Sequence, residues 1–444
     1  MKKTWKCLAA LVAALCLLCG AFGCRGNTND TDPDAVELRV GYQQDTSEGI
    51  VTTALAKAFV EEQAALGKKV KVTPIGIPAG SYNDTVLRMY NGETLPDVVY
   101  TYDDYASLWA QNGVFEKLDP YFAQDEFDFS LYDSKAFEAA RVYQNSIYYA
   151  PREYNHPVVF VNTAMMKEYG VDISAYRNGW TWEQLVALCE KIRTEMDKKP
   201  MKDYLYPLDA SMEWAPVLNA FVRSKGGELF DPESGNPGFD QAGTLTAMTE
   251  INDMIGKKLI PDPRSTASGG AFLNENAAMW ITSRPKVSSC VDSEIELAFL
   301  PMPKMGGEEG AHYLSYGNTG YAISSISEKK ELAWEFLKFV MSERGQETFS
   351  ATGNCVPILT SMQNAADATW RNSLPGVDQS AFVSSEGDGY TYILTTFARG
   401  YNPSKERDIY NKIRQLMGEL RGKSTAESVS SFCSYAQEQV NGVK

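Results

Sequence analysis

The order of predicted strands and helices near the start of the chain constrains its fold more than any other feature of the sequence. Residues 36–42 alternate apolar and polar side chains, which predicts a strand, and residues 51–59 repeat apolar side chains at intervals of three and four, which predicts a helix. A second strand is predicted over 70–75, a helix over 82–90 and a third strand over 97–102. Because strands and helices alternate, we expect an α/β fold with helices covering a parallel sheet.

The same alternation returns after residue 148. Residues 158–162 are rich in valine and predict a buried strand, and Thr181 with Gln184 forms a capping box that opens a helix. Residues 296–302 predict another strand, and Ser327 is predicted to cap a helix whose apolar face runs through 333–340. No repeat of fixed period is present, which disfavours a solenoid or a propeller.

The first 23 residues have the layout of a secretory signal peptide. A basic end precedes an apolar stretch over 8–18, and no acidic residue occurs before Asp30. The apolar stretch is shorter than the roughly 20 residues that a membrane-spanning helix needs. We therefore expect residues 1–23 to direct export and to be removed.

Size and charge narrow the class of protein further. The roughly 420 residues left after the signal peptide are more than one hydrophobic core usually organises, so two lobes are expected. The whole chain carries 42 basic and 57 acidic residues, a net charge of −15, and loss of the three lysines in the signal peptide would lower this to −18. Such an acidic chain is repelled by nucleic acids and anionic lipid surfaces, so neither is an expected partner.

The sequence contains no catalytic or cofactor motif. It has two histidines, His156 and His312, and neither a serine elbow nor a glycine-rich phosphate loop. No cofactor or metal is expected, and the acidic loop over 231–236 is predicted to be a turn because it lacks EF-hand spacing. Four cysteines beyond residue 24 have no metal-site spacing and are predicted to be buried free thiols; they are Cys189, Cys290, Cys355 and Cys433.

Eight segments resemble, in the right order, the extracellular solute-binding proteins of ABC importers, in the carbohydrate-associated group that is maltose-binding-protein-like. Each segment alone is a weak signal, and the series of eight is a strong one. The segments are LPDVV at 95–99, GVFEKLD at 113–119, VFVNT at 159–163, WTWEQL at 180–185, GGELFD at 226–231, AAMW at 277–280, LPMP at 300–303 and AWEFLKF at 333–339.

This resemblance implies a two-lobed periplasmic-binding-protein-like fold of type II, in which crossing strands join the lobes and a ligand cleft lies between them. The first of the implied crossings lies near residues 155–158, with 152–155 leading into it, the second near 315–322 and the third near 353–358. By analogy, residues 36–155 with 322–353 form lobe I, and residues 156–321 with 354–444 form lobe II. The implied function is capture of a sugar or oligosaccharide by lobe closure and its delivery to the permease of an ABC importer. The resemblance implies a monomer that is not an enzyme.

The segment 20–24 resembles the lipobox of bacterial lipoproteins, with small residues before Cys24. In that family the cysteine receives a lipid and becomes the new N-terminus. Residues 24–35 are polar and contain glycine, asparagine and proline, as a flexible tether does. We therefore expect an extracytoplasmic protein that is anchored to the cell membrane through a lipid on Cys24.

Candidate contacts to the solute follow from the chemistry of a sugar. A sugar offers a rim of hydroxyls, which carboxylates, amides and guanidinium groups bind, and an apolar face, which aromatic rings cover. Such residues at predicted strand ends and crossings are the candidates, although any one of them has a structural alternative as a loop or core residue. They are Tyr42, Gln43, Asp45, Tyr82, Tyr102, Asp103, Arg152, Glu153, Asn155, Glu213, Trp214, Trp280, Arg284, Asn318 and Tyr392.

Three other functions remain open at this stage. A secreted glycoside hydrolase needs a pair of carboxylates, but 57 acidic residues make chance pairs common. The available carboxylates are those of Asp103, Asp104, Glu153 and Glu213. An anionic solute such as a sugar acid or sugar phosphate is favoured if Arg152 and Arg284 face the site, since guanidinium groups bind such anions in a bidentate manner. A surface adhesin is the third, but it needs no cleft.

Overall fold

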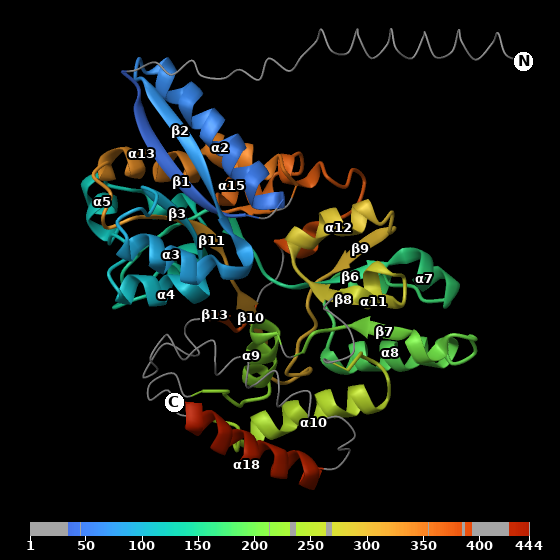
Figure 1. Cartoon of the computed structure of the whole chain (residues 1–444). Coiled ribbons are helices and arrows are strands. Elements are labelled where there is room, and N and C mark those ends of the chain that lie inside the picture. Colours follow the sequence, from blue (N-terminus) through green and yellow to red (C-terminus); the bar gives the residue numbers. More distant parts are fainter. Residues whose placement is uncertain are drawn as a thin grey trace, which may run out of the picture.

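The structure is a computed structural model. It describes residues 34–44, 46–212, 214–230, 237–262, 269–353, 355–383, 387–392 and 426–443. The predicted signal peptide, Cys24, most of the tether and the acidic loop at 231–236 lie outside the described residues. Two α/β bodies make up the molecule, each built around its own sheet (Figure 1).

The first sheet has five strands. Their order is β2 (Val70–Pro78), β1 (Val36–Gln44), β3 (Val98–Tyr102), β11 (Thr319–Ile323) and β4 (Ala150–Pro151). Strand β1 pairs in parallel with β2 and β3, whereas β11 pairs antiparallel with both β3 and β4. The expectation of a purely parallel sheet is therefore wrong, because β11 returns to this sheet from the second body and enters from the opposite direction.

Helices surround this first sheet. Helix α2 follows β1 and packs along β1 and β2, α13 packs against β11 and β4, and α14 packs against α2 and α13. Their bounds are α2 (Thr46–Ala65), α3 (Tyr82–Asn91), α4 (Asp103–Gln111), α5 (Asp119–Gln124), α6 (Ser134–Ala139), α13 (Lys330–Met341) and α14 (Glu343–Ser350).

The second sheet has four strands, in the order β7 (Tyr206–Asp209), β8 (Ala277–Thr282), β6 (Val158–Asn162) and β9 (Leu297–Leu300). Strand β6 pairs antiparallel with β8 and β9, and β7 is parallel to β8. All residues of β6, β8 and β9 are buried, which explains their nearly continuous apolar sequences. Helices of this body are α7 (Thr163–Glu168), α8 (Trp182–Met196), α9 (Ala215–Ser224), α10 (Ala242–Gly256), α11 (Gly270–Leu273), α12 (Val287–Asp292) and α18 (Ala426–Val443).

Local sequence signals locate most of these elements. The capping box at α8 is present, since the Thr181 hydroxyl accepts from the Gln184 N–H and the Gln184 side chain accepts from the Thr181 N–H. The predicted cap of α13 is wrong, because the helix begins at Lys330 with Lys329 as its N-cap residue. The Ser327 hydroxyl instead donates to Asp97 Oδ1 at 2.7 Å, which ties this turn to the start of β3.

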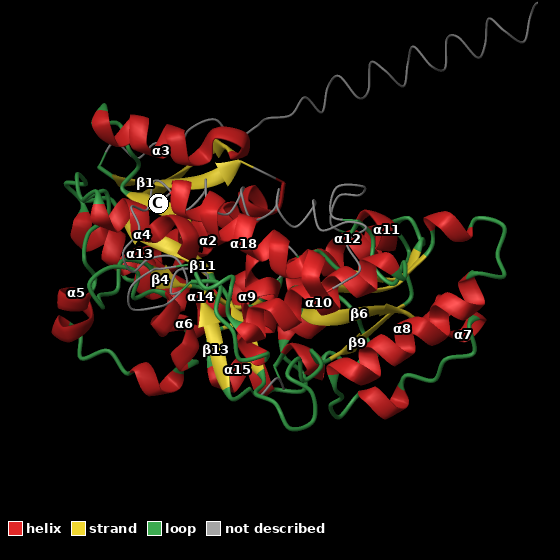
Figure 2. Ribbon diagram, turned by 90° about the horizontal axis from the view of Figure 1, so that it is seen from below, coloured by secondary structure: helices red, strands yellow, loops and turns green. Residues whose placement is uncertain are grey.

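Short strands run through the junction between the two bodies. They are β5 (Glu153–Tyr154), which pairs with β12 (Val356–Pro357), and β10 (Tyr313–Tyr316), which pairs with β13 (Gly389–Tyr392). Seen from below, the two sheets lie in separate halves of the molecule with β13 between them (Figure 2). Strand β11 extends across the boundary expected between residues 321 and 322, and the full division of the chain into lobes stays a prediction.

The remaining described elements are short. They are helix α15 (Thr360–Asn364) and the 3-10 turns η1 (Ala79–Ser81), η2 (Phe129–Leu131), η3 (Ser174–Tyr176), η4 (Lys202–Tyr204), η5 (Arg284–Lys286), η6 (Thr369–Arg371) and η7 (Ser380–Phe382). No described helix is long and apolar enough to cross a membrane.

The cysteines outside the N-terminal segment belong to the core. Cys189, Cys290, Cys355 and Cys433 are buried free thiols, as predicted. Burial raises the pKa of Cys290 and of Cys433 to about 12, so these thiols stay protonated at neutral pH. Within the described ranges, no cluster of histidine, cysteine and acidic side chains is arranged to hold a metal ion.

Candidate functional site

The carboxyl ends of β1 and β3 bring half-buried polar and aromatic side chains to one edge of the first sheet. Tyr42 and Gln43 lie near the end of β1, and Tyr102 ends β3. Because these strands are parallel neighbours, their ends meet at the edge where open α/β sheets bind ligands. The Tyr102 ring packs edge-on against Tyr105, with ring centroids 5.0 Å apart. Two further candidates at this edge, Asp45 and the side chain of Asp103, lie outside what the structure describes.

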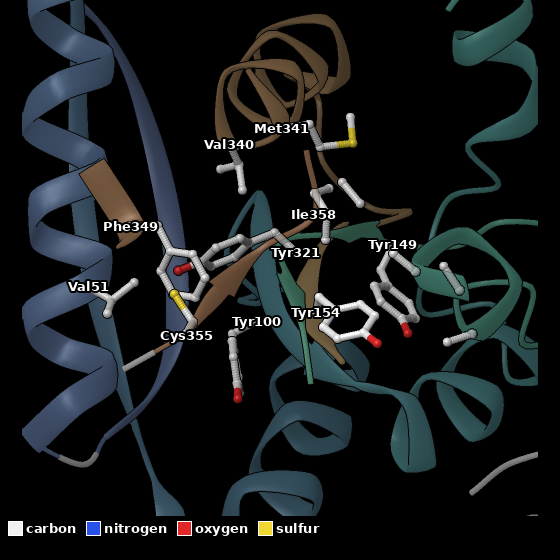
Figure 3. Close-up of a cluster of buried hydrophobic side chains, with 14 of the residues drawn as sticks. Val51, Tyr100, Tyr149, Tyr154, Tyr321, Val340, Met341, Phe349, Cys355 and Ile358 are labelled. Atoms are coloured by element: carbon white, nitrogen blue, oxygen red, sulfur yellow. The ribbon is translucent and has the colours of Figure 1, made fainter. Parts of the chain in front are cut away.

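Arg152 is fixed in the interior beside this edge. Its side chain is 2% exposed, and its Nη2 donates to Glu48 Oε1 at 2.6 Å while Nε donates to Thr319 Oγ1 at 2.8 Å. Its guanidinium carbon lies 5.0 Å from the ring centroid of Tyr100, 5.6 Å from that of Tyr321 and 4.7 Å from that of Phe349. Figure 3 shows these three rings close together in the buried cluster. The arginine is therefore enclosed by aromatic faces, which attract a cation.

Charge pairing keeps this buried arginine ionised. Desolvation lowers the pKa of Arg152, but Glu48 and then the neighbouring tyrosines and Glu153 outweigh it, so the pKa lies well above its usual value. An unpaired cation at this depth costs several kcal/mol, so Glu48 is needed for the fold as well as for any other role.

Glu153 belongs to the same network and is also buried. Its side chain is 4% exposed, and its Oε1 accepts a hydrogen bond from the Thr319 hydroxyl at 2.7 Å. Burial raises the pKa of Glu153, although Arg152 opposes the shift. Thr319 thus accepts from Arg152 and donates to Glu153, which joins the first crossing to β11.

Asn155 is the candidate at the junction that remains partly exposed. Its backbone carbonyl accepts from the Gly317 N–H at 3.1 Å, which pairs the first two crossings. Its side-chain Oδ1 is buried and finds no hydrogen-bond partner among the described residues. A buried amide oxygen of this kind is expected to have a partner, and a bound solute hydroxyl would supply one.

The second body contributes aromatic side chains from around α9. Trp214 is half-buried and is the N-cap residue of α9, which packs against β10 and β13. Tyr390, in β13, is half-buried with its ring centroid 4.8 Å from Lys135 Nζ of the first body. Glu213 and the side chain of Tyr392 lie outside the described residues. Figure 1 shows β10 and β13 between the two bodies, next to α9.

Two aromatic candidates lie in the interior. Tyr82 is 2% exposed and donates its hydroxyl to the Tyr100 carbonyl at 2.7 Å. Trp280, in β8, is 1% exposed and packs against Phe160 and Phe272, with centroid separations of 5.9 and 5.7 Å. Neither ring is available to a solute in this structure, so we do not retain them in the proposed site.

Arg284 and Asn318 are also internal. Arg284 is 1% exposed; its guanidinium donates to the carbonyls of Gly353 at 3.1 Å and Trp370 at 2.5 Å, and desolvation lowers its pKa to about 10. Asn318 is 3% exposed, accepts from the Tyr149 hydroxyl and donates to the Ala136 carbonyl. Their hydrogen bonds are used within the protein, so they too leave the proposed site.

Two residues central to this region had no predicted role. Glu48 lies in the first turn of α2, where the sequence shows only an acidic residue suited to a helix start. Gln346, in α14, is fully buried; its Nε2 donates to the Arg152 carbonyl at 2.9 Å, and its Oε1 accepts from the Ile358 N–H at 2.7 Å. It thereby connects the first and third crossings. No local pattern could reveal partners more than a hundred positions apart.

A groove of about 290 Å³ lies elsewhere, between α8 and α10 on the second body. Its lining includes Trp182, Glu183, Met254 and Lys257, and none of the candidate residues. The convergence of side chains at the strand ends, rather than this groove, therefore defines the candidate site.

Comparison with the sequence profiles of protein families identifies the family of this chain. A profile of the bacterial extracellular solute-binding proteins matches residues 48–347. The chain belongs to this family. The matched region includes the end of β3, the first crossing, α9 and β11, whereas Tyr42, Gln43 and Tyr390 lie outside it.

Individual relatives are distant in sequence but similar in fold. A maltotriose-binding protein of Pyrococcus abyssi is 20% identical over 61% of this chain, and the matched region spans only 56% of that relative's length. An ABC substrate-binding protein of Listeria monocytogenes, solved with cycloalternan, has a TM-score of 0.75 at 16% identity, covering 92% of this chain and 99% of that one. A receptor of Streptomyces glaucescens, solved without ligand and with acarbose, has a TM-score of 0.68 at 18% identity, covering 91% and 98%. The two-lobed periplasmic-binding-protein-like fold is thus established.

Proposed function

We propose that this protein captures a neutral sugar or oligosaccharide between its two bodies and delivers it to the permease of an ABC importer. The observation that carries the proposal is a buried amide oxygen, Asn155 Oδ1, that has no partner among the described residues, together with half-buried aromatic side chains on both bodies. Tyr42 and Tyr102 come from the first body, Trp214 and Tyr390 from the second, and Asn155 from the first crossing. The binding of maltotriose, cycloalternan and acarbose by its relatives supports the same class of solute.

The proposed mechanism is binding by enclosure. Aromatic rings cover the apolar face of a sugar, and amide and carboxylate oxygens accept hydrogen bonds from its hydroxyls. The solute first contacts one body, and rotation about the crossing strands then brings the other body onto it. Closure removes water from both faces of the sugar, which strengthens the hydrogen bonds made inside.

The hydrogen bonds and ion pairs of the positively charged side chains favour a neutral solute over an anion. Arg152 is held by Glu48 and enclosed by rings, and Arg284 is bonded to backbone carbonyls inside the second body. Lys135 lies 3.3 Å from Asp133 Oδ1, so its charge is also compensated. None of these three described cations is available to a carboxylate or phosphate, so we do not favour a sugar acid or a sugar phosphate.

Binding without turnover is favoured over glycoside hydrolysis. A hydrolase needs two carboxylates that reach the glycosidic bond from opposite sides. Glu153 is 4% exposed and bonded to Thr319, and Glu48 is paired with Arg152. Both described carboxylates of this region are thus used in the protein's own network. We therefore propose a binding protein and not an enzyme.

The proposed location is outside the cytoplasm, at the membrane. We propose export through residues 1–23 and lipid attachment at Cys24, and by analogy with the family a division into lobe I (36–155 with 322–353) and lobe II (156–321 with 354–444). The family's description as extracellular supports export. Mass spectrometry of the protein from cell membranes tests the anchor, because a diacylglycerol-modified Cys24 must be its first residue.

Calorimetry with the chain from residue 25 onward tests the proposed function. We expect maltotriose or another neutral oligosaccharide to bind with micromolar or tighter affinity, and a matched sugar acid to bind at least tenfold more weakly. Tyr102→Leu should weaken binding, whereas Tyr204→Leu, a control at a 65% exposed tyrosine of η4, should not. Chromatography of the same samples should show intact sugar. Release of shorter products, or a preference for the acid, would overturn the proposal.

A further inference from the structure

We propose that the first body rests on an anionic lipid leaflet through its N-terminal tip, which comprises residues 34–37 and 64–71. The partner is a bilayer with negatively charged phospholipid headgroups. This inference rests on one part of the proposed function, lipid attachment at Cys24, and it does not depend on the identity of the solute.

The N-terminal tip is built around a preformed turn at the end of α2. The Gly67 N–H donates to the Ala64 carbonyl at 3.0 Å, and Gly67 has a φ of 73°, a left-handed conformation that glycine adopts without strain. The Lys69 carbonyl then accepts from the Val36 N–H at 3.0 Å, which ties the turn to the start of β1. The turn is therefore fixed to the sheet and does not need to be ordered when it meets a surface.

Two large apolar side chains are exposed at this tip. Every residue from 64 to 69 is exposed, and Leu66 is 65% exposed. Val36, at the start of β1 beside the turn, is 51% exposed. Exposed apolar side chains are common singly, so two of them at the end of the body nearest to a lipid anchor are the informative observation. Apolar side chains of this kind enter the boundary between headgroups and acyl chains.

The charge of the tip is opposite in sign to that of the chain. Lysines outnumber acidic side chains there, whereas the whole chain has 42 basic and 57 acidic residues. The charged residues of the tip are Lys68, Lys69, Lys71, Asp34 and Glu37. Lys69 lies 3.8 Å from Asp34 and Lys71 lies 2.9 Å from Glu37, in pairs that are exposed to solvent and so contribute little. Anionic headgroups attract the lysines and repel the acidic remainder, which favours this end as the one that faces the leaflet.

The place of the tip in the chain keeps it close to the bilayer. Ten peptide units join Cys24 to Asp34, and a fully extended chain of that length spans at most about 36 Å. A lipid on Cys24 therefore gives the tip a high effective concentration at the leaflet. Under that constraint, one exposed leucine and a few lysines are sufficient for a contact that would be too weak to recruit a free protein.

The contact leaves the candidate site free. The tip lies at the start of β1, and Tyr42 and Gln43 lie near its end. Because β1 has 9 residues, its two ends are about 30 Å apart. Figure 1 shows the start of β1 and the end of α2 at one extremity of the first body, away from the junction. With the tip on the leaflet, the strand ends that form the candidate site are held away from the headgroups, where a solute can reach them.

Quenching of tryptophan fluorescence by lipids with brominated acyl chains tests the contact. The chain from Cys24 onward is coupled through the Cys24 thiol to a maleimide lipid, which supplies the anchor chemically; its other cysteines are buried. The vesicles contain about one third phosphatidylglycerol and two thirds phosphatidylcholine. After subtraction of the signal of the unchanged protein, Leu66→Trp should be quenched at least about twofold more than Met201→Trp. Met201 is the matched control, a 62% exposed residue of the second body.

Reversal of charge tests the role of the lysines. Lys68→Glu combined with Lys69→Glu should lower the quenching of Leu66→Trp to the control level, because attraction to anionic headgroups is lost. Vesicles of phosphatidylcholine alone should have the same effect. Lys198→Glu combined with Lys202→Glu changes the net charge equally at exposed lysines of the second body, and it should leave the quenching unchanged.

Two results would overturn the inference. One is equal quenching at positions 66 and 201, and the other is quenching at position 66 that does not respond to charge reversal at 68 and 69. Calorimetry with maltotriose keeps the proposed function separate. The charge-reversed protein should bind maltotriose within about twofold of the unchanged protein, since separate sites act independently. Failure of the unchanged protein to bind any neutral sugar would contradict the proposed function and leave the quenching result as it stands.

Discussion

Arg284 fastens a long segment of the chain to the second body. Its guanidinium bonds Gly353, Trp370, Ser373 and Gln379, which lie 69 to 95 positions away in sequence. It also lies 5.1 Å from the ring centroid of Trp370 and 5.0 Å from that of Phe382. A single buried side chain thus determines the course of residues 353–379, which pass close to the junction.

Replacing Arg284 should therefore affect stability more than binding. Arg284→Met leaves several buried acceptors without a donor, and each such loss costs roughly 1–3 kcal/mol. We expect the free energy of unfolding, measured by urea denaturation, to fall by about 3 kcal/mol or more, while folded protein keeps its sugar affinity. Arg177→Met, at an exposed ion pair with Asp378, should change stability by less than about 0.5 kcal/mol. Loss of sugar binding in folded Arg284→Met would contradict this assignment.

Glu153 predicts a specific pH dependence of stability. Burial raises its pKa in the folded state above the ordinary value of 4.5, so folding favours the protonated form. The resulting stabilisation is complete below pH 4.5 and is lost as the pH rises through the raised pKa. Glu153→Gln removes this pH-dependent contribution to stability and keeps a side-chain oxygen that accepts from the Thr319 hydroxyl.

The unfolding free energies of the unchanged protein and Glu153→Gln should be compared between pH 4 and pH 8. We expect the unchanged protein to lose stability relative to the variant as the pH rises across that window. A difference that stays constant with pH would show that folding does not shift the pKa of Glu153, and a change in the opposite direction would show that folding lowers it.

At the scale of elements, the crossings are joined by one buried amide. Gln346 donates to the Arg152 carbonyl in the first crossing and accepts from the Ile358 N–H in the third. Glu153 pairs with Pro357 across the same two crossings, in the ladder of β5 with β12. The strands of the first and third crossings must bend together if the bodies rotate. Gln346 should therefore influence how the motion of one crossing is linked to that of the other.

Gln346→Leu removes these two hydrogen bonds and a third, from Nε2 to the Val340 carbonyl at 2.9 Å, at nearly constant volume. We expect stability to fall by about 2–4 kcal/mol, because three buried backbone groups lose a partner. Amide exchange followed by mass spectrometry should show faster exchange in the peptide that contains Ile358. Gln144→Leu, at an exposed turn, is the control and should leave both quantities unchanged. Unchanged exchange at Ile358 would contradict the proposed connection.

Sequence patterns predicted elements better than their pairing. Strand β6 and the capping box of α8 follow from local composition and spacing, and both occur as predicted. The antiparallel entry of β11 was not predictable in this way, since strand direction depends on where the chain has travelled between residues 162 and 319. The periodicity of apolar residues indicates which face of an element is buried, but it does not indicate which strands are neighbours.

The candidate site was predictable only in part, for a related reason. Polar residues after strands were expected at one edge of the sheet, and Tyr42 and Tyr102 do lie there. Sequence alone does not distinguish an arginine that faces a solute from one that is neutralised by a distant carboxylate. Glu48 is 104 positions from Arg152 in sequence, and the ion pair between them compensates the charge of both side chains.

At the scale of the whole molecule, the proposed capture of a sugar requires both bodies. Short strand pairs, β5 with β12 and β10 with β13, lie outside the two main sheets. The first and second sheets have their own helices and are joined by short strands, an arrangement that allows one body to rotate against the other. A sugar held at the junction should therefore slow amide hydrogen exchange in both bodies at the same sugar concentration.

Hydrogen–deuterium exchange with and without maltotriose, read by mass spectrometry over the whole chain, tests this claim most directly. We expect protection at the end of β1 with the start of α2, at the first crossing around Asn155, and at the start of α9 and in β13, all at the same sugar concentration. The groove between α8 and α10 should exchange as before. Protection confined to one body, or centred on that groove, would contradict capture of the solute between the two.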